Sequence, residues 1–164
     1  MAVYQYCTPE WFEDLEKVYE AEPTYEEQFK KLTMLVCYRV KAEPEWGIER
    51  DIIFGNDMDA GKLVKLGFYT EEKAKERADF ILTATPQEWK KILRKKSKFV
   101  TDFMLGKIKL EQGSKVAVLK LAPLSDKLVG FLTTYDIQFP DEMSPDELSK
   151  YRSYMEEFRS ELGI

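Results

Sequence analysis

The pattern of apolar and polar residues predicts two helices at the start of the chain. Thr8-Pro9-Glu10 supplies a cap, a first-turn proline and a first-turn acid, and an apolar stripe at helical spacing runs from Trp11 to Tyr19. Pro23 ends this helix. The capping-box pattern from Thr24 to Glu27 then predicts a second helix that continues to Leu32. We expect both helices to pack over a sheet.

The next stretch has the pattern of a three-stranded antiparallel meander. Residues 32–40 carry apolar side chains at both odd and even positions, which is typical of a central strand covered on both faces. Residues 48–54 alternate like a half-exposed strand, residues 55–61 form a polar turn, and residues 62–69 return. Thr70 can start one or two turns of helix.

A second succession of strand and helix follows. Phe80-Ile81-Leu82 is a short apolar strand, and Thr85-Pro86-Gln87-Glu88 is a capping box with proline at the first helical position. A basic helical passage then continues to Met104 and ends at Gly106. Residues 107–110 alternate like a short strand, and Gly113 turns the chain again.

The last third of the chain predicts two further helices. Ser125 can cap one that reaches towards Tyr135. Residues 140–144 form a linker, and a capping box at 144–147 begins a helix over 145–162 that ends at Gly163.

The segment from Ala78 to Leu121 resembles the sterol carrier protein (type two) lipid-transfer family. The matching pieces are Ala78-Asp79 before a strand, the helix from Thr85 to Leu93 with apolar Trp89, Ile92 and Leu93, the run Phe-Met-Leu-Gly-Lys-Ile-Lys-Leu at 103–110, Gly113, and an apolar segment that includes Lys120 and Leu121. Periodicity leaves helix and strand open for residues 116–121, and the resemblance implies helix.

The resemblance also implies a fold. We expect an α+β domain over residues 1–164, with a mainly antiparallel, five-stranded twisted sheet and helices covering one face. The N-terminal helices occupy residues 8–32 and the C-terminal helix residues 145–162. A length of 164 residues with 44% hydrophobic residues fits one globular domain.

Charge and composition exclude several classes of function. A net charge of −5 argues against a dedicated nucleic-acid binder, and the absence of histidine removes imidazole-based triads and the common zinc sites. We therefore expect no enzyme activity, cofactor or metal. Carboxylate chemistry stays open through Asp79, Asp102 and Asp136, which adjoin apolar segments.

The two cysteines, Cys7 and Cys37, are too few for a disulfide scaffold and are expected as reduced thiols. No secretory signal or long apolar run is apparent, so we expect a soluble, cytoplasmic protein.

The resemblance implies an apolar tunnel between sheet and helices that takes a fatty acyl chain, an isoprenoid or a sterol-like lipid. We expect the protein to bind or carry such a ligand non-covalently. A segment around Met155 and Phe158 would serve as a lid. The predicted lipid-binding residues are Phe103, Met104, Val118, Leu119, Leu128, Phe131, Leu132, Met155 and Phe158.

Two further interpretations stay open. The basic run is either the solvated face of a helix or a contact with anionic membrane, through Lys90, Lys91, Arg94, Lys95, Lys96 and Lys98. Alternatively, the fold is a non-catalytic interaction or oligomerisation module with a filled core, and the stripe from Leu148 to Leu162 binds another subunit. The sequence does not decide between a monomer and a homodimer.

Overall fold

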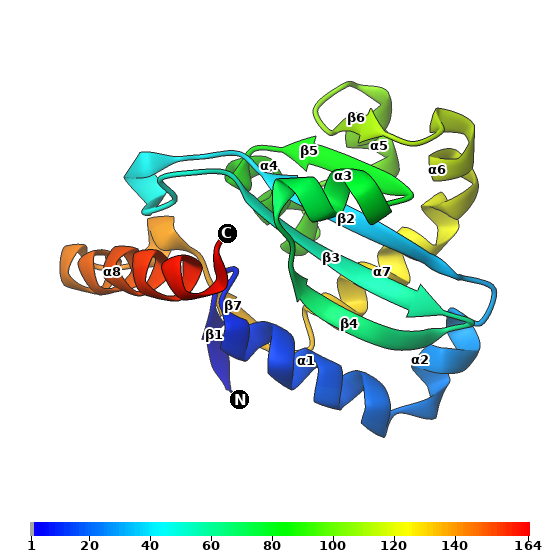
Figure 1. The fold of residues 1–164 in the computed structure, drawn as a ribbon, viewed down its shortest axis with the longest axis horizontal. Coiled ribbons are helices and arrows are strands. Elements are labelled where there is room, and N and C mark those ends of the chain that lie inside the picture. The colour runs from blue at the N-terminus through cyan, green and yellow to red at the C-terminus, as the bar shows by residue number, and fades with distance from the viewer. Residues whose placement is uncertain (1) are drawn as a thin grey trace.

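A five-stranded sheet in the order β4-β3-β2-β5-β6 forms the centre of the protein (Figure 1). The computed structural model describes residues 2–164. All neighbouring strands of this sheet are antiparallel except β2 and β5, which are parallel. The predicted α+β fold, with its mainly antiparallel five-stranded sheet, is therefore confirmed. The strands are β2 (Met34–Val40), β3 (Ile52–Asp59), β4 (Lys62–Phe68), β5 (Phe80–Ala84) and β6 (Lys109–Gln112).

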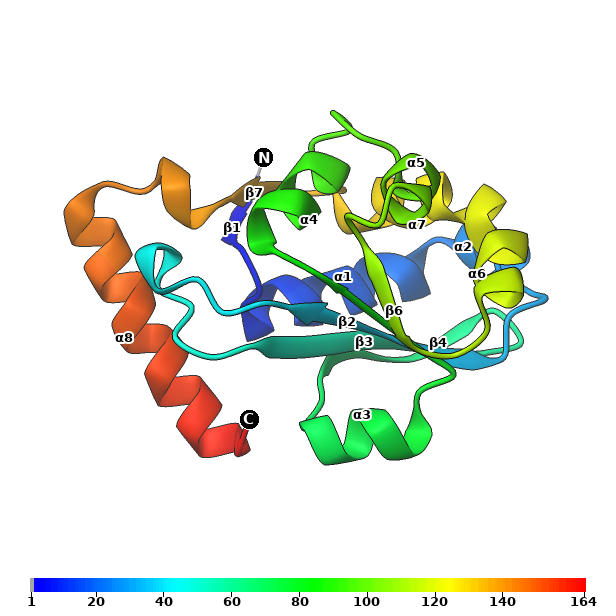
Figure 2. The same ribbon diagram turned by 90° about the horizontal axis from the view of Figure 1, so that it is seen from above.

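Helices lie on both faces of the sheet, and most of them lie on one (Figure 2). That face, called here the inner face, is covered by α1 (Pro9–Ala21), α4 (Pro86–Leu93), α5 (Phe99–Met104), α6 (Lys115–Leu121) and α7 (Ser125–Leu132). The opposite, outer face carries α3 (Glu71–Arg77). The expectation that helices cover one face is corrected by α3, whose Ala74 is buried among Leu35, Cys37 and Ile81.

The alternation of side chains along β2 explains why both faces are covered. Val36 and Tyr38 point into the main core on the inner face, whereas Leu35 and Cys37 belong to the small cluster under α3. The prediction of a central strand buried on both sides is confirmed.

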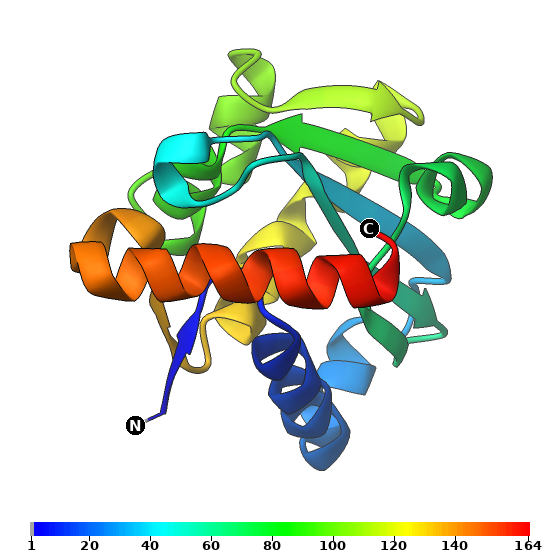
Figure 3. The same cartoon turned by 60° about the vertical axis from the view of Figure 1, so that its left-hand side comes forward.

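The C-terminal helix α8 (Pro145–Leu162) lies beside one end of the sheet rather than across a face of it (Figure 2), and it runs across the front of the view in Figure 3. Its predicted capping box is confirmed, because Ser144 and Glu147 exchange hydrogen bonds of 3.0 and 3.1 Å. The Tyr151 hydroxyl donates to the Tyr6 carbonyl oxygen at 2.5 Å, and Arg159 donates to the carbonyl oxygens of residues 50 and 51. These bonds fasten α8 to the rest of the domain.

Shorter elements complete the chain. A separate parallel pair joins β1 (Val3–Gln5) to β7 (Asp136–Gln138), which the apolar pattern does not predict because both strands have three residues. The remaining helices are α2 (Pro23–Gln28), η1 (Pro44–Trp46), η2 (Ala122–Leu124) and η3 (Pro140–Glu142).

Three local predictions need correction. The α2 helix ends at Gln28 instead of Leu32, and Glu22 rather than Thr24 caps it. The basic passage is not one helix, since Lys95 has a φ of 59° and separates α4 from α5. The predicted turn at 55–61 is mostly strand.

The true turn between β3 and β4 contains two residues. Ala60 and Gly61 both have positive φ, of 50° and 84°, as a type I′ hairpin requires. A Cβ on Gly61 would lie 2.4 Å from the Glu26 carbonyl oxygen, so the hairpin packs against α2 only because this residue is glycine.

Candidate ligand-binding cavity

A cavity of about 130 Å³ lies between the inner face of the sheet and the helices above it. Its floor comes from β2, β3, β4 and β5, and its walls and roof come from α1, the α2–β2 connection, α4, α5, α6, η2 and α7. The residues that line it are predominantly aliphatic or aromatic. They include Tyr6, Tyr19, Val36, Tyr38, Asn56, Phe99, Val118, Leu121, Leu124, Ser125, Leu128, Phe131 and Leu132.

The cavity is costly for the fold. Protein interiors are normally close-packed, and empty volume in a core costs roughly 24 cal/mol per Å³. A volume of 130 Å³ then corresponds to about 3 kcal/mol of lost stability. An apolar occupant would restore these contacts.

Most polar groups at the cavity wall are satisfied by the protein. The Tyr19 hydroxyl donates to the Gly61 carbonyl oxygen at 2.5 Å, and the Ser125 hydroxyl donates to the Ala122 carbonyl oxygen at 2.6 Å. The Tyr38 hydroxyl donates to Oδ1 of Asn56 at 2.7 Å. Burial raises the pKa of Tyr38 and raises that of Tyr19 to about 12, so both phenols are neutral. No charged side chain from residues 2–164 lines the cavity.

The structure brings four of the predicted lipid-binding residues to the cavity. Val118 comes from α6, and Leu128, Phe131 and Leu132 come from α7. Phe131 is held by edge contacts with Tyr19, at 5.2 Å between ring centroids, and with Tyr25, at 5.1 Å.

The other five predicted residues lie elsewhere. Phe103 is buried and stacks on Phe99, which does line the cavity. Met104 is 56% exposed at the end of α5. Leu119 borders a shallow surface hollow near the start of α5. Met155 and Phe158 lie on the buried face of α8, where Phe158 packs on Phe68 of β4. The segment expected to be a lid is thus part of the packed core.

The sheet residues of the cavity were missed by sequence reasoning. Val36, Tyr38 and Asn56 form much of the floor. The alternation along residues 34–40 already places Val36 and Tyr38 on one face. Their sequence, however, gives no sign that the volume above them is unfilled.

Acidic neighbours neutralise three of the six cations of the basic segment. Lys90 pairs with Asp141 at 2.9 Å, and Arg94 pairs with Glu142 at 2.7 Å. Lys98 lies 3.4 Å from Asp126. Within the described part of the chain, the exposed lysines at positions 91, 95 and 96 make no ion pair.

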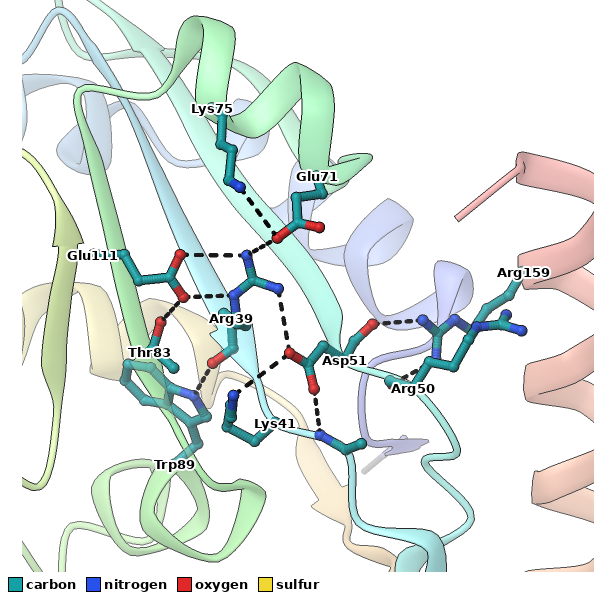
Figure 4. A network of polar contacts seen from close by, with 11 residues as sticks. Arg39, Lys41, Arg50, Asp51, Glu71, Lys75, Thr83, Trp89, Glu111 and Arg159 are labelled. Carbon is teal, nitrogen blue, oxygen red and sulfur yellow. Dashed lines mark hydrogen bonds and ion pairs between the residues drawn. The ribbon is translucent and has the colours of Figure 1, made fainter.

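The outer face holds a polar network centred on Arg39 of β2 (Figure 4). Its guanidinium pairs with Glu111 and Glu71, each at 2.6 Å, and with Asp51 at 3.2 Å. Hydrogen bonding from Arg39 lowers the pKa of Glu71. Because these acids come from the loop before β3, from α3 and from β6, Arg39 ties three separate segments to the centre of the sheet.

A buried carboxyl pair joins α4 to α5. Thr85 caps α4 as predicted, but Glu88 does not close the capping box; it is buried beside Asp102. Burial raises the pKa of Glu88 and the proximity of Asp102 raises it further, whereas Lys91 and Lys107 lower it. The pair therefore favours a protonated Glu88.

The three aspartates considered for carboxylate chemistry are not brought together. Asp79 accepts a 2.9 Å hydrogen bond from the Leu35 amide, Asp102 is buried, and Asp136 is exposed on β7. Cys7 and Cys37 are free and buried, and burial raises the pKa of Cys37 to about 12. Such a thiol is un-ionised at neutral pH.

A helix-covered, five-stranded α+β sheet with an internal apolar cavity defines the class of structure. No protein-family model and no curated protein matches the sequence. Among solved structures, the chain is similar to a crystal structure of sterol carrier protein 2, with a TM-score of 0.69 and 17% identity, over 79% of this chain and 98% of that one.

Two further structures share the architecture. A conserved hypothetical protein from Thermus thermophilus, described as possibly a sterol carrier protein, matches with a TM-score of 0.69 and 18% identity, over 82% of this chain and 92% of that one. Sterol carrier protein 2 from Yarrowia lipolytica, in its apo form, matches with a TM-score of 0.51 and 15% identity, over 74% of this chain and 89% of that one. The chain therefore has the fold of sterol carrier protein 2.

No helix within residues 2–164 combines the length and hydrophobicity needed to cross a membrane.

Proposed function

We propose that the protein binds an apolar small molecule or lipid chain non-covalently in the cavity between the sheet and helices α6 and α7. The observation that carries the proposal is the unfilled apolar volume of about 130 Å³ in an otherwise packed core. The shared fold supports it, because the solved structures of that fold are named as sterol carriers. Binding then requires no nucleophile, cofactor or metal.

The size of the cavity limits what it takes in its present form. An apolar cavity of roughly 150 Å³ accepts benzene, so the cavity at its present size holds one ring or a short chain. A longer acyl chain or a sterol requires the wall to move. Helix α6 and η2 are suited to this, since α6 buries only Val118 and η2 buries no residue.

The binding energy comes from burial of apolar surface. Each buried methylene contributes about 0.8 kcal/mol. About ten of them give roughly 8 kcal/mol before the costs of association, which is the scale of micromolar binding. Selectivity among apolar bodies of similar size is then weak.

The test combines two measurements. Native mass spectrometry of the protein as purified is expected to show a bound apolar molecule. After delipidation, the affinity for an uncharged fluorescent apolar probe, measured by displacement titration, is expected to fall at least tenfold in Val36→Phe, because the larger side chain enters the cavity.

Val64→Phe is the matched control. Val64 is 60% exposed on β4 and lies outside the cavity, so the same substitution there leaves the affinity unchanged. Absence of binding by the native protein, or equal affinity of the two variants, overturns the proposal.

The alternative, an interaction module that uses the stripe on α8, is disfavoured by burial. Tyr151 and Met155 are each 1% exposed, and Phe158 is 5% exposed. A partner could reach these three residues only after α8 had separated from its own domain, and of the predicted stripe Leu162, at 55% exposure, is the residue that is open to solvent.

We also propose that Lys91, Lys95 and Lys96 contact an anionic membrane surface, because the other three predicted cations already form ion pairs with acidic residues. Lysines near such a surface contribute about 1 kcal/mol each. Replacing all three by glutamate should reduce sedimentation with anionic vesicles and remove its salt dependence. The matched control replaces exposed Lys17, Lys30 and Lys62 by glutamate, and equal loss in both variants would contradict this surface.

A further inference from the structure

The cavity contains two polar groups that the protein leaves without a hydrogen-bond partner. The hydroxyl of Tyr6 is buried and unpaired within the described residues. Asn56 is 5% exposed. Among residues 2–164 its side-chain amide makes one hydrogen bond, which Oδ1 accepts from the Tyr38 hydroxyl. The amide nitrogen of Asn56 is therefore free to donate. By contrast, Tyr19 and Ser125 already donate to backbone carbonyl oxygens.

The position of Asn56 makes this free donor well defined. The residue lies on β3 in the middle of the sheet, opposite Val36 of β2 and Leu66 of β4. The Tyr38 hydroxyl donates to Oδ1 of the Asn56 side-chain amide and thereby fixes the orientation of this amide. Its NH₂ group is left without a hydrogen-bond partner. A rigid strand therefore presents an oriented donor at the floor of an apolar cavity.

A ligand that fills the cavity and shuts the Asn56 amide nitrogen off from water without accepting its hydrogen bond loses about 1–3 kcal/mol, whereas a ligand that accepts this bond avoids the loss. The charge of that ligand group is also constrained. Within residues 2–164 no cation lines the cavity, and a buried carboxylate without a counter-ion is strongly unfavourable. A neutral oxygen therefore suits the site, whereas a carboxylate does not.

We propose that the cavity selects apolar ligands that carry one neutral oxygen acceptor, such as a ketone, ester or alcohol, and that Asn56 Nδ2 donates the hydrogen bond to it. This inference rests on the proposed binding function and names the chemical class of the ligand. Asn56 is then the residue that gives an otherwise unselective cavity its preference.

The experiment compares two ligands of nearly equal shape that fit the cavity, cyclohexanone and methylenecyclohexane. Their affinities for the delipidated protein are measured by NMR titration. Because water solvates the ketone better, the informative quantity is the ratio of the two affinities and its change between variants. A typical net hydrogen bond corresponds to about a threefold to tenfold change in this ratio.

The variants separate Asn56 from its neighbour. In Tyr38→Phe the ratio should stay as in the wild type, since Asn56 still donates. In the double variant Tyr38→Phe/Asn56→Leu, the affinity for the ketone relative to that for the hydrocarbon should fall by about threefold to tenfold. The double variant is used because Asn56→Leu alone would leave the Tyr38 hydroxyl free to replace the lost donor.

Ser125→Ala is the matched control, because it removes a polar group from the same cavity that is already satisfied internally. Its ratio should not change. If both ligands bind and the ratio is equal in Tyr38→Phe and in the double variant, this inference is wrong and the proposed function stands. If neither ligand binds the wild-type protein, the proposed function itself fails, and the inference fails with it.

Discussion

The two faces of the central sheet differ in how their side chains are held, although the same strands supply both. On the inner face, Val36 and Tyr38 of β2 border empty volume beneath α6 and α7. On the outer face, the alternate residue Cys37 is packed under α3, and Arg39 binds three acids from three segments. A fastened outer face gives the strands a fixed position, so the inner face can keep a cavity without the sheet collapsing into it.

The largest expected effect comes from breaking the outer network. Arg39→Met leaves three carboxylates without their shared cation. Loss of one partner from a buried ion pair costs about 3–5 kcal/mol. Because the acids here are partly exposed to solvent, we expect a smaller decrease in the free energy of unfolding, of about 2–3 kcal/mol. Urea unfolding measures this. Lys41→Met, which removes a 3.8 Å contact with the same Asp51, should have no measurable effect. Equal stability of Arg39→Met and the wild type would contradict the fastening role.

Added volume should act with opposite sign on the two faces. Val36→Phe fills part of the cavity and should raise the free energy of unfolding by about 1 kcal/mol. Ala74→Leu adds volume under α3, where Ala74 is fully buried in a packed cluster, and should lower it by about 1–3 kcal/mol. Urea or thermal unfolding of both variants decides. Destabilisation of similar size by both substitutions would mean that the inner face is as tightly packed as the outer one.

The roof of the cavity should respond to pH through Glu88. Its raised pKa means that the folded protein retains a proton that the unfolded chain loses as the pH rises above about 4.5. The free energy of unfolding therefore falls through the interval up to the raised pKa and stays lower above it. Glu88→Gln should be more stable than the wild type at pH 8, and the difference should shrink towards pH 4.

The control for this prediction is Glu147→Gln. Backbone hydrogen bonding at Ser144 lowers the pKa of Glu147, so its ionised form stabilises the fold and its replacement should be unfavourable at pH 8. Thermal unfolding across this pH range measures both variants. A difference between Glu88→Gln and the wild type that does not vary with pH would show that the buried pair does not control the response.

The smallest effect concerns ligand exchange. Ser114 caps α6 with a 3.3 Å bond to the Ala117 amide, and Thr70 caps α3 with a 3.1 Å bond to the Lys73 amide. Each alanine substitution should cost about 1 kcal/mol or less of stability. Stopped-flow release of a fluorescent ligand should become severalfold faster in Ser114→Ala and should not change in Thr70→Ala. Equal release rates would exclude α6 as the moving wall.

The sequence predicts the elements better than it predicts the cavity. The buried strand at 34–40 and the start of α8 follow from local periodicity and capping, and the α+β class and the helix at 115–121 follow from the resemblance. These features depend on residues near one another in the chain. The break at Lys95 was missed because a run of lysines and an arginine is compatible with a continuous helix.

The lining of the cavity depends on distances that no local pattern contains. Phe103 and Phe131 are both apolar residues of short helices, yet only Phe131 lines the cavity. The same pattern places Met155 and Phe158 on one stripe but does not say that the stripe meets Phe68. Whether volume stays empty is decided by the sum of side-chain sizes across several elements. For that reason Asn56, a polar residue in a segment predicted to be a turn, drew no attention.

Diffraction from a crystal of delipidated protein under xenon pressure tests the central claim most directly. Xenon enters empty apolar cavities of this size. We predict a xenon peak between Val36 of β2 and Leu128 of α7, and its loss in Val36→Phe. A xenon-pressurised crystal with no peak at that position, and continuous side-chain density in its place, would contradict the account.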